Sequence, residues 1–305
     1  MRSTVLGTSS LDSSRLAYGC MRISGDNSPE AREIGKEALR AAVEAGYNHF
    51  DHADLYGGGH SESIFAEVLA ESPGLRDNLI VTSKCGIRQA LHPTPGSPKR
   101  YDFSRDYILQ SVDGSLRRLD VDHLDLFMLH RPDYLMNPEE VAGIFETLKD
   151  AGKVKFFGVS NFAPSQFALL QKFSPVPLLT NQIEINIDNM SAVTDGTLDQ
   201  CMELNVTPMA WCPLGGVAYP AWGGTLSESQ HARIRAELAL QSEKYGAEPW
   251  IVILAWLLRH PSNIVPIIGS TQPARIRAAL QSLDLEYSRE DWYRLIEARN
   301  GEEVA

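Results

Sequence analysis

Short apolar runs alternate with longer amphipathic stretches along the whole chain. The apolar runs lie at residues 16–20, 48–51, 79–84, 124–130, 154–159, 178–183, 206–211 and 265–268. Segments with helical spacing lie at residues 31–45, 61–70, 105–119, 138–151, 164–172, 197–204, 226–245, 250–259, 273–283 and 289–298. Because strands that alternate with helices are typical of a parallel sheet, the pattern predicts a parallel sheet covered by helices.

The apolar runs favour a closed barrel over an open, doubly wound sheet. LDLFMLH at residues 124–130 is apolar at nearly every position, which suits a strand buried on both faces. Eight strands of similar length close naturally into a (β/α)8 TIM barrel. Turn-forming residues at Gly7 and residues 12–14 predict a small hairpin below the barrel. We therefore expect one barrel domain spanning residues 1–305, with an N-terminal hairpin and extra C-terminal helices.

The composition is that of a globular protein and argues against two classes of partner. The chain has 28 Lys and Arg against 39 Asp and Glu, a net charge of −11, whereas nucleic-acid-binding proteins usually carry a basic surplus. The longest apolar run, residues 250–258, is shorter than the roughly 20 residues of a membrane-spanning helix. No apolar signal core or paired cysteine spacing is present, so we expect a cytoplasmic protein.

Four polar side chains lie at or just after the ends of neighbouring predicted strands. Asp51 ends the second strand, Tyr56 follows in a glycine-rich loop, Lys84 ends the third strand and His130 ends the fourth. Each also has a structural interpretation when taken singly. In chain order, these are a turn former, a packing residue, a lysine that reaches solvent and a buried histidine. Because the carboxyl ends of barrel strands meet at one face, the four together predict an active site.

The chemistry of such a group suits the reduction of a carbonyl. A free tyrosine hydroxyl has a pKa of about 10, and a nearby lysine ammonium would lower it by favouring the phenolate. An aspartate paired with the lysine would keep the lysine charged, and a histidine could orient a carbonyl oxygen. The group therefore predicts a general acid.

The segments that carry these residues resemble the aldo-keto reductase family. FDHADLYG at residues 50–57, followed by Ser61 and Glu62, is similar to the first motif of the family, and the segment at 115–133 that contains His130 is similar to the second. GVSNF at 158–162, NQIE at 181–184 and PIIGST at 266–271 follow in the family's order. The resemblance covers nearly the whole chain, from about residue 19 to residue 280.

The resemblance implies an enzyme that reduces aldehydes and ketones, with NADPH/NADP+ as its cofactor. Tyr56 would be the general acid, Lys84 the partner that lowers its pKa, Asp51 the partner of Lys84, and His130 the residue that orients the carbonyl. The other expected partner is a small-molecule carbonyl substrate. The identity of the substrate and the oligomeric state stay open.

Further positions are assigned to the cofactor by the same resemblance. Ser160, Asn161 and Gln182 would hold the nicotinamide carboxamide, and Trp211 would stack on the ring. Ser270 and Arg275 would hold the 2′-phosphate at a helix N-terminus, although such residues also simply cap helices. The remaining candidates are Met21, Cys212, Pro213, Leu214, Gly215, Gly269 and Thr271. Cys212 is expected to be a packing residue rather than a redox thiol.

Three positions or segments depart from the family's pattern or extend it. His52 stands where the family has Thr or Ser, and on a strand its side chain would point away from Asp51. Ala278 and Ala279 stand where the family often has Glu-Asn near the adenine, which weakens the case for strict NADPH preference. The segment 87–103 is a long loop rich in proline and glycine, expected to form part of the pocket wall.

Two other functions are considered beside carbonyl reduction. HFDHAD at residues 49–54 could belong to a metal-dependent hydrolase, but His49 and His52 would point to opposite faces of a strand, and we expect no metal. A regulatory protein that binds the cofactor without turnover would use the same fold. The chain lacks the glycine-rich motifs of Rossmann and P-loop enzymes, which argues against those two classes.

Overall fold

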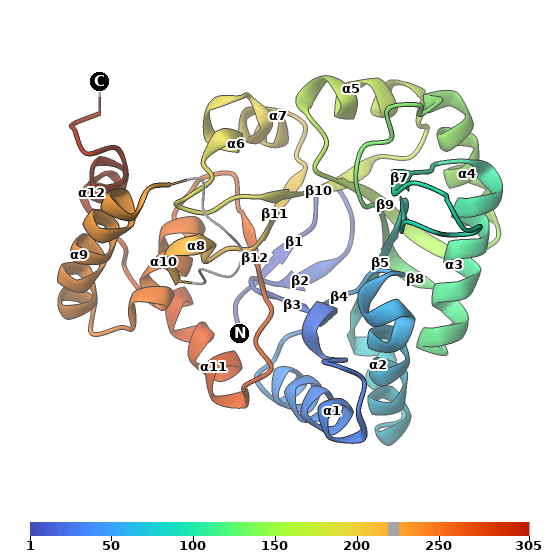
Figure 1. Ribbon diagram of the computed structural model, residues 1–305, viewed down its shortest axis with the longest axis horizontal. Coiled ribbons are helices and arrows are strands. Elements are labelled where there is room, and N and C mark those ends of the chain that lie inside the picture. The colour runs from blue at the N-terminus through green and yellow to red at the C-terminus, as the bar shows by residue number, and fades with distance from the viewer. Residues whose placement is uncertain (219–225, 305) are drawn as a thin grey trace.

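Eight parallel strands form a closed barrel in the computed structural model, which describes residues 1–218 and 226–304 (Figure 1). The barrel strands are β3 (Ala17–Gly19), β4 (His49–Asp51), β5 (Ile80–Cys85), β8 (Leu124–Leu129), β9 (Val154–Ser160), β10 (Leu178–Glu184), β11 (Thr207–Trp211) and β12 (Val265–Ile268). β12 pairs with β3 and closes the ring. The (β/α)8 prediction is therefore confirmed, and each strand overlaps its predicted run.

Among the described residues, eight helices surround the barrel; the first seven lie between successive strands, and the eighth follows the last strand. These are α1 (Pro29–Glu44), α2 (His60–Glu71), α3 (Arg105–Leu119), α4 (Pro138–Asp150), α5 (Pro164–Phe173), α7 (Thr197–Glu203), α10 (Pro249–Leu258) and α11 (Pro273–Ala278). The added helices are α6 (Ser191–Thr194), α8 (Gly215–Ala218), α9 (Glu228–Tyr245) and α12 (Arg289–Asn300). Short 3-10 helices occur at η1 (Cys20–Arg22), η2 (Tyr56–Gly59), η3 (Leu75–Asn78) and η5 (Ala279–Leu283). The segment expected as one helix at 273–283 is thus divided between α11 and η5.

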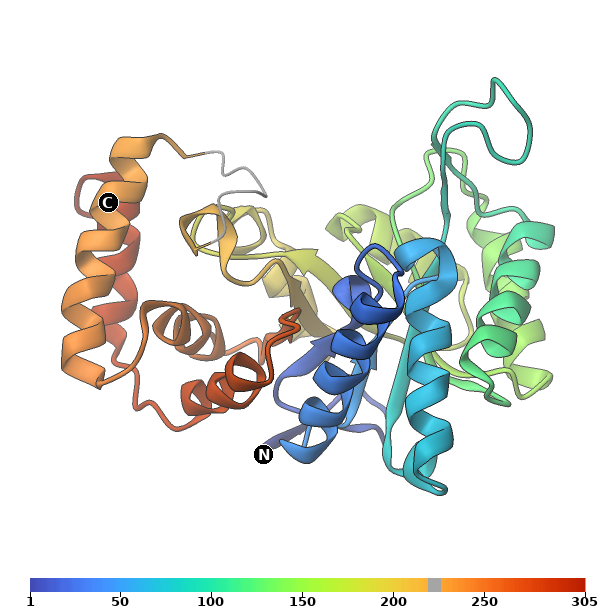
Figure 2. The same cartoon turned by 60° about the horizontal axis from the view of Figure 1, so that its bottom comes forward.

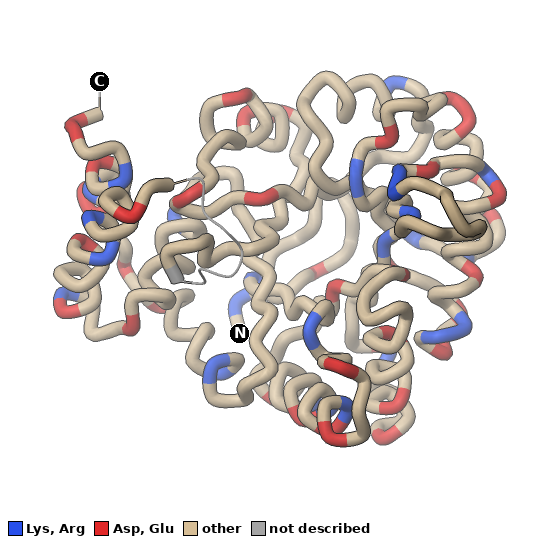
Figure 3. The backbone as a smooth tube through the Cα atoms, in the orientation of Figure 1, with Lys and Arg blue, Asp and Glu red and all other residues tan. Residues whose placement is uncertain are grey.

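The long helices α9 and α12 lie side by side at one edge of the molecule, beyond the ring of barrel helices (Figure 2). They are the extra C-terminal helices predicted from the sequence. Charged residues lie mainly on the outer helices and loops, with both signs interspersed (Figure 3). Within the part of the chain that the structure describes, no helix is long and apolar enough to cross a membrane.

The predicted N-terminal hairpin is present as the antiparallel pair β1 (Ser3–Val5) and β2 (Asp12–Ser14). Leu6, in its turn, is fully buried among apolar side chains of the barrel strands. The backbone N–H of Gly7 donates to Thr207 Oγ1 at the start of β11 (2.8 Å). Gly7 has a positive φ of 53°, and a Cβ there would lie 2.9 Å from the Leu179 carbonyl oxygen, so this close approach requires glycine. The hairpin therefore packs at the amino ends of the strands.

The segment after β5 contains regular structure that the sequence pattern does not reveal. Residues expected as a loop form the short antiparallel pair β6 (Ile87–Arg88) and β7 (Arg100–Tyr101). The connection between them extends outward beyond the helices (Figure 2). Because each strand has only two residues, no alternation of apolar and polar positions could mark them.

Candidate active site

A buried ion pair lies at the carboxyl ends of β4 and β5. Lys84 Nζ is 2.7 and 2.8 Å from the two carboxylate oxygens of Asp51, and it also donates to the carbonyl oxygen of His52 (2.7 Å). These acceptors can use all three N–H groups of the ammonium. Lys84 is fully buried, and burial lowers its pKa while Asp51 opposes that change. The pair therefore holds a lysine at a fixed position in the barrel interior.

Tyr56 and His130 lie beside this pair. The ring of Tyr56 is centred 5.2 Å from Lys84 Nζ, and the rings of Tyr56 and His130 meet edge to face with centroids 5.8 Å apart. Tyr56 begins η2, where Gly57 and Gly58 adopt positive φ angles and let the chain turn sharply after the strand. The structure thus brings the four predicted residues together at one end of the barrel.

The acidity of Tyr56 differs from the prediction. Burial and then the Asp51 carboxylate raise the pKa of Tyr56 well above its usual value, so in the protein alone the net shift is opposite to the predicted lowering. The physical reason is that the surrounding protein removes the phenol from water, and the negative charge of Asp51 disfavours a second negative charge on Tyr56. Tyr56 therefore keeps its proton at neutral pH.

His130 is a neutral imidazole in this environment. Burial, followed by the charges of Lys84 and Arg131, lowers the pKa of His130 well below its usual value. Its Nδ1 atom is buried and has no hydrogen-bond partner among the described residues. A neutral ring carries one N–H donor, which suits a contact with an uncharged oxygen.

The predicted carboxamide-holding residues form a connected hydrogen-bond cluster. Ser160 Oγ donates to the carbonyl oxygen of Gln182 (2.8 Å), and Asn161 Nδ2 donates to Ser160 Oγ (2.8 Å) and to the carbonyl oxygen of His130 (3.3 Å). Gln182 Nε2 donates to Asp51 Oδ1 (2.9 Å). Asn161 has a positive φ of 61°, which asparagine tolerates better than most residues. The cluster is therefore tied to both the ion pair and His130.

Trp211 joins the same cluster from the end of β11. Its indole N–H donates to Asn161 Oδ1 (2.9 Å), which fixes the orientation of the ring. The Arg131 guanidinium lies 5.2 Å from the centroid of the ring. The side chain is partly exposed, so part of its flat surface can contact a ligand.

The other predicted cofactor residues lie in the loops after β3, β11 and β12. Met21 is 39% exposed in η1, Arg275 is exposed on α11, and Gly269, Ser270 and Thr271 are partly exposed. The Ser270 backbone is held in place by Tyr18, whose hydroxyl donates to the Ser270 carbonyl oxygen (2.9 Å). This bond fixes the start of the loop from which α11 emerges.

The loop after β11 is packed against the barrel. Pro213 and Gly215 are buried, Leu214 is partly buried against two apolar clusters, and Cys212 has a positive φ of 50°. The Cys212 carbonyl oxygen accepts from Asn186 Nδ2 (2.9 Å). Burial raises the pKa of the Cys212 thiol, which agrees with a packing residue rather than a reactive thiolate.

Asp188, which the sequence did not single out, anchors this loop. Its Oδ2 atom accepts from the backbone N–H groups of Gly216 and Val217, and its Oδ1 atom contacts His231 Nε2 on α9 (3.1 Å). One carboxylate therefore ties the beginning of α8 to α9. No local pattern marks this residue, because its partners are 28 to 43 positions away in the chain.

The two histidines of the metal-site alternative have separate environments. His49 contacts Ser13 Oγ (3.0 Å) and Thr82 Oγ1 (2.8 Å) through its two ring nitrogens. His52 faces α2, with its ring 4.7 Å from that of Phe65, and thus points away from Asp51 as predicted. Across residues 1–218 and 226–304, no three His, Cys, Asp or Glu side chains gather in an arrangement that could hold a metal ion.

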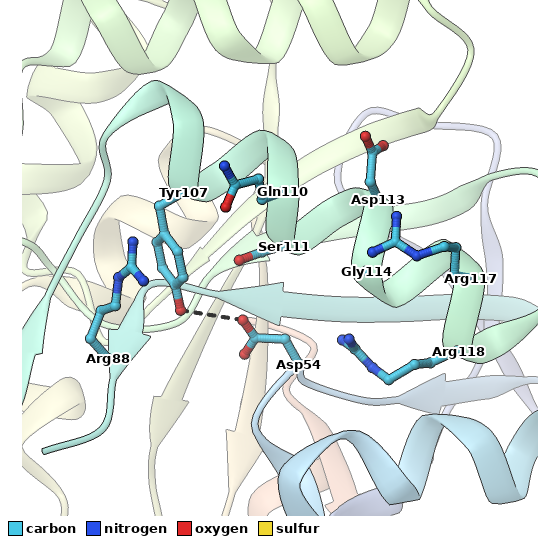
Figure 4. A pocket seen from close by; sticks show the side chains of 9 residues that line it. All are labelled: Asp54, Arg88, Tyr107, Gln110, Ser111, Asp113, Gly114, Arg117 and Arg118. Carbon is cyan, nitrogen blue, oxygen red and sulfur yellow. Dashed lines mark hydrogen bonds between the residues drawn. The ribbon is translucent and has the colours of Figure 1, made fainter. Parts of the chain in front are cut away.

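A cleft of about 460 Å³ lies next to the segment that carries Tyr56 (Figure 4). The Tyr107 hydroxyl on α3 donates to Asp54 Oδ2 (3.4 Å), and the Arg88 guanidinium lies 3.9 Å from the centroid of the Tyr107 ring. Burial and then the charge of Glu62 raise the pKa of Asp54 to about 7. A carboxyl group that titrates near neutral pH thus lies two residues before Tyr56.

Comparison with known proteins agrees with this geometry. A model of the Aldo/keto reductase family matches residues 15–300, nearly the entire chain. The chain belongs to the aldo/keto reductase family. It is therefore an enzyme of an oxidoreductase family whose members generally use nicotinamide cofactors.

Relatives of this aldo/keto reductase match it over nearly their full lengths. It is 41% identical to the oxidoreductase YdhF of Escherichia coli, over 95% of each chain. It is 39% identical to a 6-dehydroglucose reductase of Novosphingobium aromaticivorans, over 98% of this chain and 96% of that protein. The crystal structure of the thermostable aldo-keto reductase Tm1743 with the inhibitor epalrestat superposes with a TM-score of 0.83 at 27% identity, covering 98% of this chain and 100% of the other.

The residues at the barrel mouth of this aldo/keto reductase fit a nicotinamide ring. Ser160, Asn161 and Gln182 place hydroxyl and amide groups together, and these carry both the donors and the acceptors that a carboxamide needs. The partly exposed indole of Trp211 lies against the same cluster and offers a flat apolar surface. The donor set and the aromatic face together match a planar ring that bears an amide.

Proposed function

We propose that this enzyme is a carbonyl reductase that converts a small aldehyde or ketone to its alcohol with NADPH. The observation that carries the proposal is the Asp51–Lys84 ion pair, which lies beside Tyr56 and His130 at the mouth of the barrel. An uncharged proton donor, a neutral imidazole and a fixed ammonium are the groups that reduction of a carbonyl needs.

Each of the four residues has a defined part in this reaction. When bound, NADPH would supply the hydride that reduces the carbonyl carbon. Tyr56 gives its hydroxyl proton to the carbonyl oxygen, and because an alkoxide is a much stronger base than a phenolate, a phenol of raised pKa still donates. Lys84 stabilises the phenolate that remains, and Asp51 keeps Lys84 in position. The neutral His130 donates a hydrogen bond that orients the carbonyl oxygen.

The cofactor contacts follow the same geometry. Ser160, Asn161 and Gln182 would hold the carboxamide, and Trp211 would support the ring. The loop of Cys212 to Gly215, together with Met21, would line the path of the nucleotide. Ser270 and Arg275 would hold the 2′-phosphate of NADPH, since an arginine fork suits a phosphate group, and Gly269 and Thr271 would line the same part of the cofactor site. The exposed position of Arg275 leaves its guanidinium accessible to such a ligand.

The relatives suggest which substrates to test first. One relative that is 39% identical and another that is 38% identical are 6-dehydroglucose reductases. A sugar-derived aldehyde is therefore a reasonable member of the first substrate panel, beside simple aldehydes and ketones.

The decisive experiment is NADPH-oxidation kinetics against this panel, with NADH measured in parallel. We expect oxidation that depends on both protein and carbonyl, with a lower KM for NADPH than for NADH. Absence of oxidation with every carbonyl would overturn the proposal. Tight binding of NADPH without turnover would instead favour the cofactor-binding regulatory alternative.

A further inference from the structure

Arg131 is a partly buried cation beside the proposed catalytic group. It follows His130 directly, and its guanidinium lies 5.2 Å from the centre of the Trp211 ring. Among the described residues, no carboxylate forms an ion pair with it. The nearby Asp133 is engaged elsewhere, accepting from the backbone N–H groups of Phe103 (3.0 Å) and Leu135 (2.9 Å). Because burying part of an unpaired charge is costly, a ligand that supplies acceptors would bind favourably at this position.

The charge of Arg131 acts where the carbonyl would react. It lowers the pKa of His130 and opposes the rise in the pKa of Tyr56, so both groups lie within its electrostatic reach. These are the two residues proposed to contact the carbonyl oxygen. A substrate bound there would place the atoms next to its carbonyl carbon within reach of Arg131.

The barrel order separates Arg131 from the proposed phosphate site. β8, which precedes Arg131, is four strands from β12 in either direction around the ring, so the two strands are opposite each other. The proposed 2′-phosphate ligands Ser270 and Arg275 follow β12. This arrangement assigns Arg131 to the substrate rather than to the cofactor phosphates.

We propose that Arg131 determines substrate specificity by selecting carbonyl compounds that carry an oxygen acceptor beside the carbonyl, either a carboxylate bonded directly to the carbonyl carbon or a hydroxyl on the adjacent carbon. The proposal rests on the proposed carbonyl reduction. A guanidinium presents parallel N–H donors, which bind two oxygen atoms at once with defined geometry. Such a contact would fix one orientation of the substrate in front of Tyr56 and His130.

The test compares three small aldehydes of similar size: glyoxylate, glycolaldehyde and propanal. We expect Arg131→Leu to reduce kcat/KM for glyoxylate, glycolaldehyde or both by about tenfold to a hundredfold, chiefly by raising KM. The value of kcat/KM for propanal should fall by no more than about threefold. Arg131→Lys keeps the charge but loses the fork. It should restore part of the glyoxylate activity if a carboxylate is the ligand, and little of the glycolaldehyde activity if a hydroxyl is.

The control is Arg40→Leu, because Arg40 lies on α1, away from the site, and already pairs with Glu71 (2.7 Å). Its ratio of activities among the three aldehydes should match that of the wild type. An equal loss of all three activities in Arg131→Leu, or no loss with either oxygenated aldehyde, would overturn the proposal. Hydration of glyoxylate affects every variant equally and cancels in the comparison.

Failure of the proposed function gives a different result. In that case the wild type oxidises NADPH with none of the aldehydes, and Arg131 is tested by calorimetric titration of the protein with oxalate and with ethylene glycol. Binding of either compound that weakens by about tenfold in Arg131→Leu would support the selection of oxygen acceptors. Equal binding by the wild type and the variant would overturn it.

Discussion

Gln182 and Asp51 form a hydrogen bond across the interior of the barrel. The side-chain amide of Gln182 on β10 donates to Asp51 Oδ1 at the end of β4 (2.9 Å), and both side chains are buried. β10 and β4 are four strands apart in either direction around the ring. A residue proposed to hold the carboxamide is therefore bonded directly to the carboxylate that positions Lys84.

The first prediction concerns Gln182→Leu. Loss of the amide removes a carboxamide ligand and one donor to Asp51, so the Kd for NADPH should rise by about tenfold, equivalent to about 1.4 kcal/mol. Gln182→Glu should weaken binding further, because it places a second carboxylate beside Asp51. Fluorescence titration with NADPH measures both effects. Gln200→Leu, which removes a bond to the Pro164 carbonyl oxygen (2.8 Å), is the control and should leave the Kd unchanged. An unchanged Kd in Gln182→Leu would contradict the proposed contact.

The second prediction concerns the proton donor. Tyr56→Phe should lower kcat by at least about 100-fold, since general acid catalysis contributes on that scale, while the Kd for NADPH changes by less than about twofold. Tyr47→Phe is the matched control, because that hydroxyl is buried and donates to the Ile276 carbonyl oxygen (3.0 Å). It should cost about 1 kcal/mol in the free energy of unfolding and leave kcat unchanged. A Tyr56→Phe variant with the wild-type kcat would remove Tyr56 from the mechanism.

The sequence predicted the barrel and the meeting of Asp51 with Lys84 because both depend on strand order. Residues at the carboxyl ends of adjacent parallel strands must lie near one another, and alternation along a strand explains why His52 faces α2. The family motifs then located Tyr56 and His130 in the turns that follow.

What the sequence did not predict depends on side-chain directions in loops and on the burial of charge. The bond between Trp211 and Asn161 joins two loops whose shapes no periodicity determines. The direction of the Tyr56 pKa shift does not follow from the sequence, because it depends first on the burial of the phenol and then on the nearby charge of Asp51. The sequence does not mark Arg131, because only the three-dimensional structure shows that no carboxylate within residues 1–218 and 226–304 forms an ion pair with it.

The third prediction concerns the pH dependence of stability at Asp54. Burial and then Glu62 raise the pKa of Asp54 to about 7, so between about pH 4 and pH 7 the folded protein binds a proton that the unfolded chain has lost. The contribution of the protonated Asp54 to the free energy of unfolding is therefore fully present below about pH 4 and is lost as the pH rises to about 7. Asp54→Asn stays neutral throughout. Its free energy of unfolding, relative to that of the wild type, should therefore be about 2–3 kcal/mol higher at pH 8 than at pH 5, at about 1.4 kcal/mol per pH unit.

Urea unfolding of the wild type and Asp54→Asn at both pH values measures this difference. His49 and His52 titrate with the opposite sign, but they are present in both proteins and cancel in the comparison. Asp113→Asn is the control, since Asp113 lines the same cleft and pairs with Lys153 in a more exposed position (2.6 Å). A pH-independent difference between Asp54→Asn and the wild type would show that Asp54 is ionised in the folded protein at both pH values.

The fourth prediction is that His52→Leu stabilises the enzyme. Both ring nitrogens of His52 are buried and have no hydrogen-bond partner among the described residues, whereas the ring packs against Phe65. Leucine has a similar volume and no polar atoms, so the free energy of unfolding at pH 7 should rise by about 1–2 kcal/mol. The His52 carbonyl oxygen, which accepts from Lys84, belongs to the backbone and is retained, so kcat should stay near that of the wild type.

The same substitution should change the pH profile in a defined direction. Burial and then Lys84 lower the pKa of His52 to about 3, so between about pH 3 and pH 6.5 the unfolded chain binds a proton that the folded protein does not. The contribution of the neutral His52 to the free energy of unfolding of the wild type is therefore fully present above pH 6.5 and is lost as the pH falls. At pH 5 the advantage of His52→Leu should therefore exceed its value at pH 7 by about 2 kcal/mol, at about 1.4 kcal/mol per pH unit. Urea unfolding at the two pH values measures this change, and an advantage at pH 5 no larger than at pH 7 would mean that the folded protein protonates His52.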